Sequence, residues 1–187
     1  MADLERALAI QGWMSPVELA WLAEQASTAL LVLELGCWKG RSTRALADNM
    51  PNGSVMLAVD TWEGSPSESG SALGAELSAR SGAAVHRDFL ENMGDHIAAG
   101  RVVVIRGDRE SAAVSAAPLS GSFDLVFIDA DHVRESVELD IAALLPLLKK
   151  GGVMAGHDWL RDGVQQAVTA QLRHRPLVVE QIWWVRT

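Results

Sequence analysis

The stretch Leu31 to Gly40, LVLELGCWKG, decides the fold of this chain. Its apolar start is typical of a buried β-strand, and the two glycines that follow Glu34 predict a sharp bend before a helix. A second apolar run, VMLAVD from Val55 to Asp60, ends in a carboxylate about 20 residues after the bend, near the spacing at which nucleotide-binding folds hold a ribose. Together the two runs predict a ligand that contains a nucleoside.

The composition is typical of one globular domain. The chain has 187 residues, of which 49% are hydrophobic, so we expect a single domain over residues 1–187. Nucleic acid is not expected as a partner, because the net charge of -8 does not favour contact with phosphates. No apolar run reaches the roughly 18 residues of a membrane span, so no membrane partner is expected. The lone Cys37 and the absence of a signal-peptide pattern predict a cytoplasmic protein.

Helix and strand patterns alternate along the chain. Residues 1–28 are expected to form an N-terminal helical cap, with Ser15 and Glu18 as the capping box of a helix over 16–26. Residues 64–82, rich in Ser, Gly and Ala, are expected to form a substrate loop. Further helices are predicted over residues 40–50, 85–99, 110–117, 133–149 and 163–174, and strands over residues 31–35, 55–60, 102–105, 123–129, 153–156, 177–179 and 182–185.

This order predicts an α/β fold. We expect a Rossmann-like, doubly wound, mostly parallel sheet of seven strands with helices on both faces. The last two strands are too close for a crossover helix, so an antiparallel C-terminal strand is expected. Ligands of such sheets bind outside the carboxyl ends of the strands, where Asp60, Asp129 and Asp158 are predicted to lie.

Five motifs occur in an order that resembles one known family. They are Glu34-Leu-Gly36-x-x-x-Gly40, Asp60, Gly107-Asp108, FDLVFIDADH over residues 123–132, and LLKKGGVMAGHD over residues 147–158. Together they resemble the class I S-adenosylmethionine-dependent methyltransferases, and within them the small-molecule O-methyltransferase branch with its macrolide-sugar and catechol-type enzymes. The resemblance implies methyl transfer from S-adenosylmethionine to a hydroxyl of a small-molecule acceptor, phenolic or sugar-like.

For the methionine end of the cofactor, the resemblance assigns roles to the bend. Gly36 and Gly40 would leave room for the methionine part, whose carboxylate would meet backbone N–H groups and the Ser42 hydroxyl. Glu34 would take up the ammonium group, directly or through water, since a buried carboxylate needs a cationic or hydrogen-bonding partner. The two glycines could equally serve only the turn.

For the nucleoside end, the resemblance assigns roles to residues after the second and third strands. Asp60 would accept the ribose hydroxyls. Gly107 and Asp108 would lie at the adenine amino group, with Trp62 or Arg109 as a wall for the base. The structural alternatives are a cap after the strand for Asp60 and a helix N-cap for Asp108.

Two designs for removing the acceptor's proton fit the acids of this chain. In the first, Asp129 and Asp158 hold a divalent cation such as Mg²⁺, which lowers the pKa of a substrate hydroxyl. Catechol-type relatives have an Asn where Trp159 follows Asp158 here, so Asp131 or His157 would have to replace that ligand.

In the second design no metal is needed. His157 or His132 takes the proton as general base, since imidazole titrates near neutral pH. His157 is preferred for its place beside Asp158, although a lone histidine often caps a strand end. Asp129 also borders the expected cofactor site.

Other classes remain open at this point. An NAD-dependent oxidoreductase would share the strand, glycine and acid order, but Gly36-x-x-x-Gly40 lacks the middle glycine of the dinucleotide fingerprint. A non-catalytic binding protein with a methyltransferase fold is the other alternative. Because residues 1–28 leave little material for a lid, a homodimer whose second subunit covers the site is an additional expectation.

Overall fold

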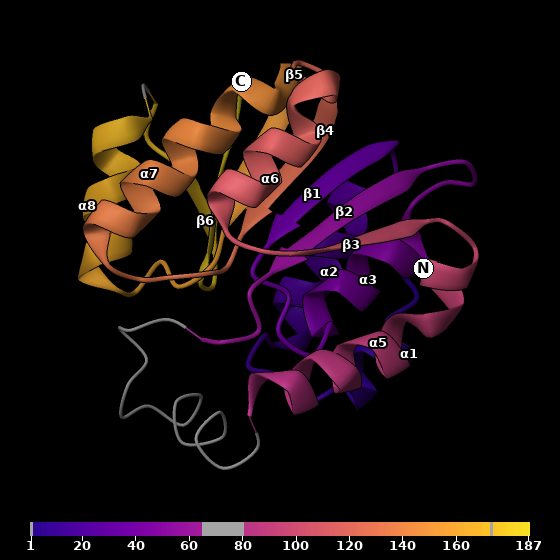
Figure 1. Ribbon diagram of the computed structural model, residues 1–187. Helices are drawn as coiled ribbons and strands as arrows, with labels where there is room; N and C mark the ends of the chain where they lie inside the picture. Colours follow the sequence, from indigo (N-terminus) through magenta and orange to yellow (C-terminus); the bar gives the residue numbers. More distant parts are fainter. Residues whose placement is uncertain (1, 65–80, 173) are drawn as a thin grey trace.

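The computed structural model describes residues 2–64, 81–172 and 174–187. Within them, seven strands form one sheet in the order β3-β2-β1-β4-β5-β7-β6. Figure 1 shows this sheet between two layers of helices. The strands are β1 (Leu31–Leu35), β2 (Val55–Asp60), β3 (Val102–Arg106), β4 (Phe123–Ile128), β5 (Leu148–Gly156), β6 (Leu177–Val179) and β7 (Ile182–Arg186).

The helices divide between the two faces of the sheet. Helices α1, α2, α3 and α5 pack on one face, and α6, α7 and α8 on the other. Side chains of a strand alternate between faces, so Val32 packs in the first layer and Leu33 in the second. The helices are α1 (Glu5–Ala9), α2 (Pro16–Ala26), α3 (Arg41–Asn49), α5 (Gly82–Ala98), α6 (Arg109–Ala116), α7 (Arg134–Leu144) and α8 (Asp162–Gln171), with 3₁₀ turns η2 (Ala117–Leu119) and η3 (Leu145–Leu147).

The pairing of the strands confirms the predicted sheet. Strands β1 to β5 pair in parallel, whereas β7 runs antiparallel to both β5 and β6. The parallel strands therefore place their carboxyl ends at one edge, where the cofactor and catalytic residues were predicted to meet.

The start of β5 differs from the prediction. The helix predicted over residues 133–149 ends at Leu144, and Pro146 lies in the following 3₁₀ turn. Proline lacks an N–H group and clashes with the preceding turn, so it ends the helix here. Strand β5 then begins at Leu148 and includes Gly151 and Gly152, opposite an irregularity in β4. The glycines therefore lie inside a strand and do not terminate a helix.

One further boundary depends on a tertiary contact. Helix α5 begins at Gly82, three residues before the predicted start, because the chain packs closely there: a Cβ on Gly82 would lie 2.0 Å from the carbonyl oxygen of Trp62.

The predicted substrate loop falls mostly on residues 65–80, outside the described residues. Of the helices described, none is long and apolar enough to cross a membrane.

Candidate active site

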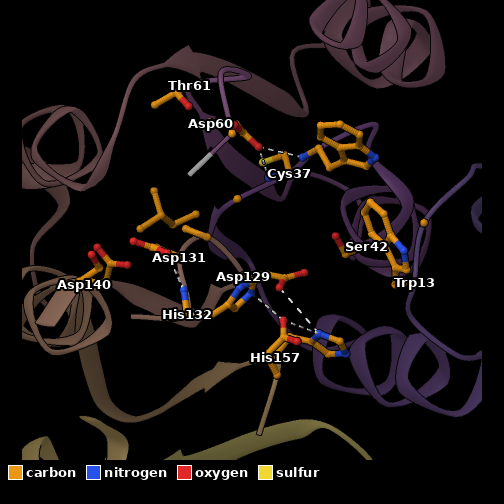
Figure 2. Close-up of a pocket in the computed structure, with 18 of the residues that line it drawn as sticks. Trp13, Cys37, Ser42, Asp60, Thr61, Asp129, Asp131, His132, Asp140 and His157 are labelled. Carbon is orange, nitrogen blue, oxygen red and sulfur yellow. Dashed lines mark hydrogen bonds and ion pairs between the residues drawn. The ribbon is translucent and has the colours of Figure 1, made fainter. Parts of the chain in front are cut away.

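A cavity of about 690 Å³ opens at the carboxyl ends of the parallel strands. Figure 2 shows Asp60 and Thr61 at one end and His157 at the other, with Asp129 between them. The predicted site residues that line it are Gly36, Ser42, Asp60, Gly107, Asp108, Arg109, Asp129, Asp131, His132, His157 and Asp158.

Gly36 forms the tight part of the bend after β1. Its φ is +90°, and a Cβ there would lie 1.9 Å from the carbonyl oxygen of Asp129. Only glycine therefore allows the end of β1 to approach the end of β4 this closely. The bare backbone at this point faces the cavity.

Glu34 lies under the bend and does not line the cavity. It is fully buried, and its Oε2 accepts a hydrogen bond from Thr43 Oγ1 at 2.6 Å. Among the described residues Oε1 has no hydrogen-bond partner. Burial raises the pKa of Glu34 to about 7, against the opposing hydrogen bonds. The buried oxygen without a partner could accept a hydrogen bond from a water or a cation that reaches under the bend.

Asp60 joins the end of β2 to this bend. Its carboxylate accepts backbone N–H groups of Cys37 at 2.7 Å, Trp38 at 2.8 Å and Trp62 at 2.6 Å. The side chain nonetheless lines the cavity. Asp60 thus caps the chain after its strand, and contact with a ribose stays a prediction.

Two predicted cofactor residues face the core. Trp62 is fully buried, its Nε1 donates to the carbonyl oxygen of Trp38 at 2.7 Å, and its ring centroid lies 5.1 Å from that of Phe89. A Cβ on Gly40 would meet Met93 and Phe89 at 3.2 Å. Gly40 therefore permits packing against α5, and Trp62 is not a wall for the base.

The adenine end of the predicted site lies at the start of α6. Asp108 caps this helix by accepting the N–H groups of Glu110 and Ser111, and these bonds lower its pKa. It also lines the cavity together with Arg109. Arg109 Nη1 contacts Asp140 Oδ1 at 2.9 Å, and burial raises the pKa of Asp140 to about 6. Arg109 thus lines the cavity where Trp62 does not.

A cluster of three side chains lies at the ends of β4 and β5. One potential ligand atom from each of Asp129, His132 and Asp158 lies within 4.8 Å of the others. His132 Nε2 contacts Asp158 Oδ2 at 2.8 Å. Burial raises the pKa of Asp129 to about 6. Burial also acts on Asp158, but its hydrogen bonds to His132 and His157 lower its pKa. We call these residues the catalytic cluster.

His157 is held differently from His132. Its Nε2 contacts Glu18 Oε1 at 3.1 Å, and its Nδ1 lies 3.2 Å from Asp158 Oδ2 and 3.7 Å from Asp129 Oδ1. Burial disfavours its charged form, but these carboxylates raise the pKa of His157 to about 10. An imidazolium engaged at both nitrogens has no lone pair for a substrate proton. These contacts occupy both ring nitrogens of His157, and its role as general base stays a prediction.

The cluster offers two carboxylates and one imidazole to a cation. This donor set suits a divalent transition ion better than Mg²⁺, which prefers oxygen ligands. In this cluster His132 offers the third potential ligand atom, in the place for which Asp131 or His157 was predicted.

A second wall of the cavity was not predicted. Gly12, Trp13 and Met14 line it, although they precede the first strand. The Trp13 ring centroid lies 5.9 Å from that of Trp38. Arg41, at the start of α3, holds this segment by donating to the carbonyl oxygens of Leu8, Ile10 and Met14. The only signal in the sequence is an arginine directly after the glycine bend.

Comparisons with known proteins agree with this geometry. The family model of the methyltransferase domain matches residues 33–159. No curated protein matches the chain significantly. The O-methyltransferase from Bacillus cereus, solved in complex with SAH, has a TM-score of 0.62 and 21% identity over 89% of this chain and 72% of its own.

Two further solved structures share the fold at low identity. The O-methyltransferase TomG from Streptomyces achromogenes, involved in tomaymycin synthesis and solved with SAM, has a TM-score of 0.63 and 16% identity over 91% of this chain and 73% of its own. CalS11, a TDP-rhamnose 3'-O-methyltransferase of calicheamicin biosynthesis, has a TM-score of 0.59 and 19% identity over 90% of this chain and 76% of its own. The chain belongs to the methyltransferase domain family and has the class I S-adenosylmethionine-dependent methyltransferase fold.

Proposed function

We propose that this protein transfers the methyl group of S-adenosylmethionine to a hydroxyl of a small molecule, phenolic or sugar-like. The observation that carries the proposal is the continuity of one cavity from the bend at Gly36, past Asp60, to the catalytic cluster. The residues predicted to hold the cofactor thereby share one cavity with a group that can take a proton. The O-methyltransferases named above, two of them bound to SAM or SAH, support the choice of cofactor and acceptor.

The residues present fit the cofactor. The methionine part would lie against the bare backbone of Gly36 and the hydroxyl of Ser42. The unpartnered Oε1 of Glu34 beneath the bend would attract the ammonium group, directly or through water. Asp60 would accept the ribose hydroxyls, and Asp108 with Arg109 would border the adenine.

The chemistry requires positioning and one proton transfer. S-adenosylmethionine supplies an electrophilic methyl group and leaves as S-adenosylhomocysteine. The acceptor oxygen forms the new C–O bond as the C–S bond breaks in line, and the hydroxyl proton passes to a base. The walls formed by Trp13 and Gln181 would orient the acceptor toward that methyl group.

His132 is the base that we propose. It lines the cavity, and Asp158 holds its Nε2 at 2.8 Å, as a carboxylate orients the histidine of a catalytic dyad. In a second arrangement, Asp129, His132 and Asp158 would hold a divalent cation that lowers the pKa of the hydroxyl. The donor set supports both arrangements.

The test uses S-adenosylmethionine with an isotopically labelled methyl group and a panel of phenols, sugars and amines. The wild type, Asp129→Asn, Asp158→Asn and His132→Gln are assayed with and without EDTA. Label on a hydroxyl oxygen, lost in His132→Gln, is the expected result. Unchanged activity after chelation and in both Asp variants would remove the metal arrangement. Label found only on amines would overturn the proposed acceptor.

A further inference from the structure

Glu18 is an acidic residue buried in the first turn of α2. Only 2% of its surface is exposed, so both carboxylate oxygens need partners. Its Oε2 accepts the backbone N–H of Ser15 at 2.8 Å, which completes the capping box. Its Oε1 accepts from His157 Nε2 at 3.1 Å and from the backbone N–H of Gln181 at 3.0 Å. Capping the helix therefore accounts for only one of the two oxygens.

The second oxygen connects α2 to the cavity. Glu18 Oε1 holds the ring of His157 by its Nε2. The Nδ1 of the same ring lies 3.2 Å from Asp158 Oδ2 and 3.7 Å from Asp129 Oδ1. Asp158 in turn holds His132 at 2.8 Å. A row of contacts thus runs from Glu18 through His157 to the catalytic cluster. Figure 2 shows the His157 ring next to Asp129 at this end of the cavity.

The same oxygen also fixes the turn between β6 and β7. Gln181 lines the cavity, and its carbonyl oxygen accepts the backbone N–H of Trp159 at 3.0 Å. Glu18 itself does not line the cavity. The hydrogen bonds that link Glu18 to the cavity therefore run through His157 and Gln181.

We propose that Glu18 is a positioning residue for methyl transfer, which holds the imidazole of His157 so that Asp129 and Asp158 keep their places at the cavity. The proposal rests on the proposed function. Burial favours this reading, because without the carboxylate the Nε2–H of His157 would remain buried with no acceptor. The ring would then turn away, and the carboxylates of the catalytic cluster would lose their shared cationic neighbour.

The test separates this role from helix capping. Glu18→Ala removes both carboxylate oxygens, and Glu18→Gln keeps the size of the side chain without its charge. Ser15→Ala is the matched control, because it removes the Oγ that accepts the N–H of Glu18 and leaves the carboxylate on His157. A mutation away from the chemistry that misplaces a reacting group by about 1 Å can lower the rate roughly 100-fold.

We expect both Glu18 variants to lower kcat by about 10- to 100-fold, with an unchanged KM for S-adenosylmethionine. Ser15→Ala should lower thermal stability and leave kcat unchanged. Equal kcat in Glu18→Ala and Ser15→Ala would overturn the positioning role.

A readout that needs no activity follows the ring of His157. In ¹⁵N-labelled protein, the Nε2 signal of His157 should shift in both Glu18 variants and stay in place in Ser15→Ala. An unchanged Nε2 signal in Glu18→Ala would by itself overturn the proposal. Failure of the wild type to transfer methyl groups would instead overturn the proposed function, so the two failures are distinguishable.

Discussion

Gly36 lies against the carbonyl oxygen of Asp129, so closely that a Cβ on residue 36 would be 1.9 Å from that oxygen. The backbone hydrogen bond from Asp129 N to the carbonyl oxygen of Leu35, 2.8 Å long, fixes the same approach from the other strand. The bend that would receive the cofactor and the acid that begins the catalytic cluster are therefore parts of one rigid junction.

Gly36→Ala should disrupt this junction. A left-handed φ costs a non-glycine residue about 1–2 kcal/mol, and the overlap with Asp129 should add about 1–3 kcal/mol. Gly53→Ala is the control, because Gly53 has a φ of +82° and nothing within 4 Å of its Cβ position. In urea unfolding we expect the larger loss of unfolding free energy in Gly36→Ala. Equal losses in the two variants would contradict the contact.

Asp60→Asn should weaken cofactor binding. A hydrogen bond to a charged group contributes about 1.5–3 kcal/mol, so the affinity for S-adenosylhomocysteine should fall about 10- to 100-fold. Asp124→Asn is the control. Like Asp60, Asp124 accepts backbone N–H groups, here those of Leu30 and Leu31, but it lies at the opposite end of β1. Calorimetry should find the loss in Asp60→Asn alone, and an equal loss in both variants would point to a purely structural Asp60.

Glu34 should make stability depend on pH. Burial raises its pKa from 4.5 to about 7 in the folded state. A carboxyl whose pKa is raised by folding stabilises the folded state at pH values below its pKa in the unfolded chain. This contribution is lost as the pH rises through its pKa in the folded state. The shift corresponds to about 3 kcal/mol. Glu34→Gln, which stays neutral, should gain unfolding free energy relative to the wild type between about pH 4.5 and pH 7. Parallel pH profiles in urea unfolding would show that Glu34 titrates normally.

Arg41→Lys should loosen the wall that carries Trp13. Lysine cannot reproduce the forked donors by which Arg41 reaches several carbonyl oxygens of residues 8–14. The KM for the methyl acceptor should rise about tenfold, the effect of losing one strong hydrogen bond. Arg101 binds the carbonyl oxygens of Ala47 and Met50 and does not line the cavity, so Arg101→Lys should leave this KM unchanged. A rise in both variants would indicate a general loss of stability.

The parallel sheet was predictable because its strands contain short runs of apolar residues, with a glycine or an acid at the end of each strand or just after it. The bend at Gly36 and the acids Asp60, Asp129 and Asp158 follow those strands directly, so local sequence places them at one edge. The start of β5 was not predictable in the same way. Apolar residues on both sides of Pro146 continue the helical spacing, and only the effect of proline on the backbone separates helix from strand.

The rest of the site depends on contacts between distant segments. Trp62 stands beside an acid in the sequence, yet its ring packs in the core under α5. Trp13 reaches the cavity because Arg41 holds its segment there, a contact without a local signature. Glu18 reads as a helix cap, and its second oxygen reaches His157 only after α2 packs near the end of β5.

We propose that the cavity between Gly36 and the catalytic cluster binds S-adenosylmethionine. Isothermal titration calorimetry of the full chain with S-adenosylhomocysteine and, separately, with NAD tests it most directly. We expect saturable one-to-one binding of S-adenosylhomocysteine, weakened in Asp60→Asn, and no heat with NAD. Binding of NAD alone would contradict it.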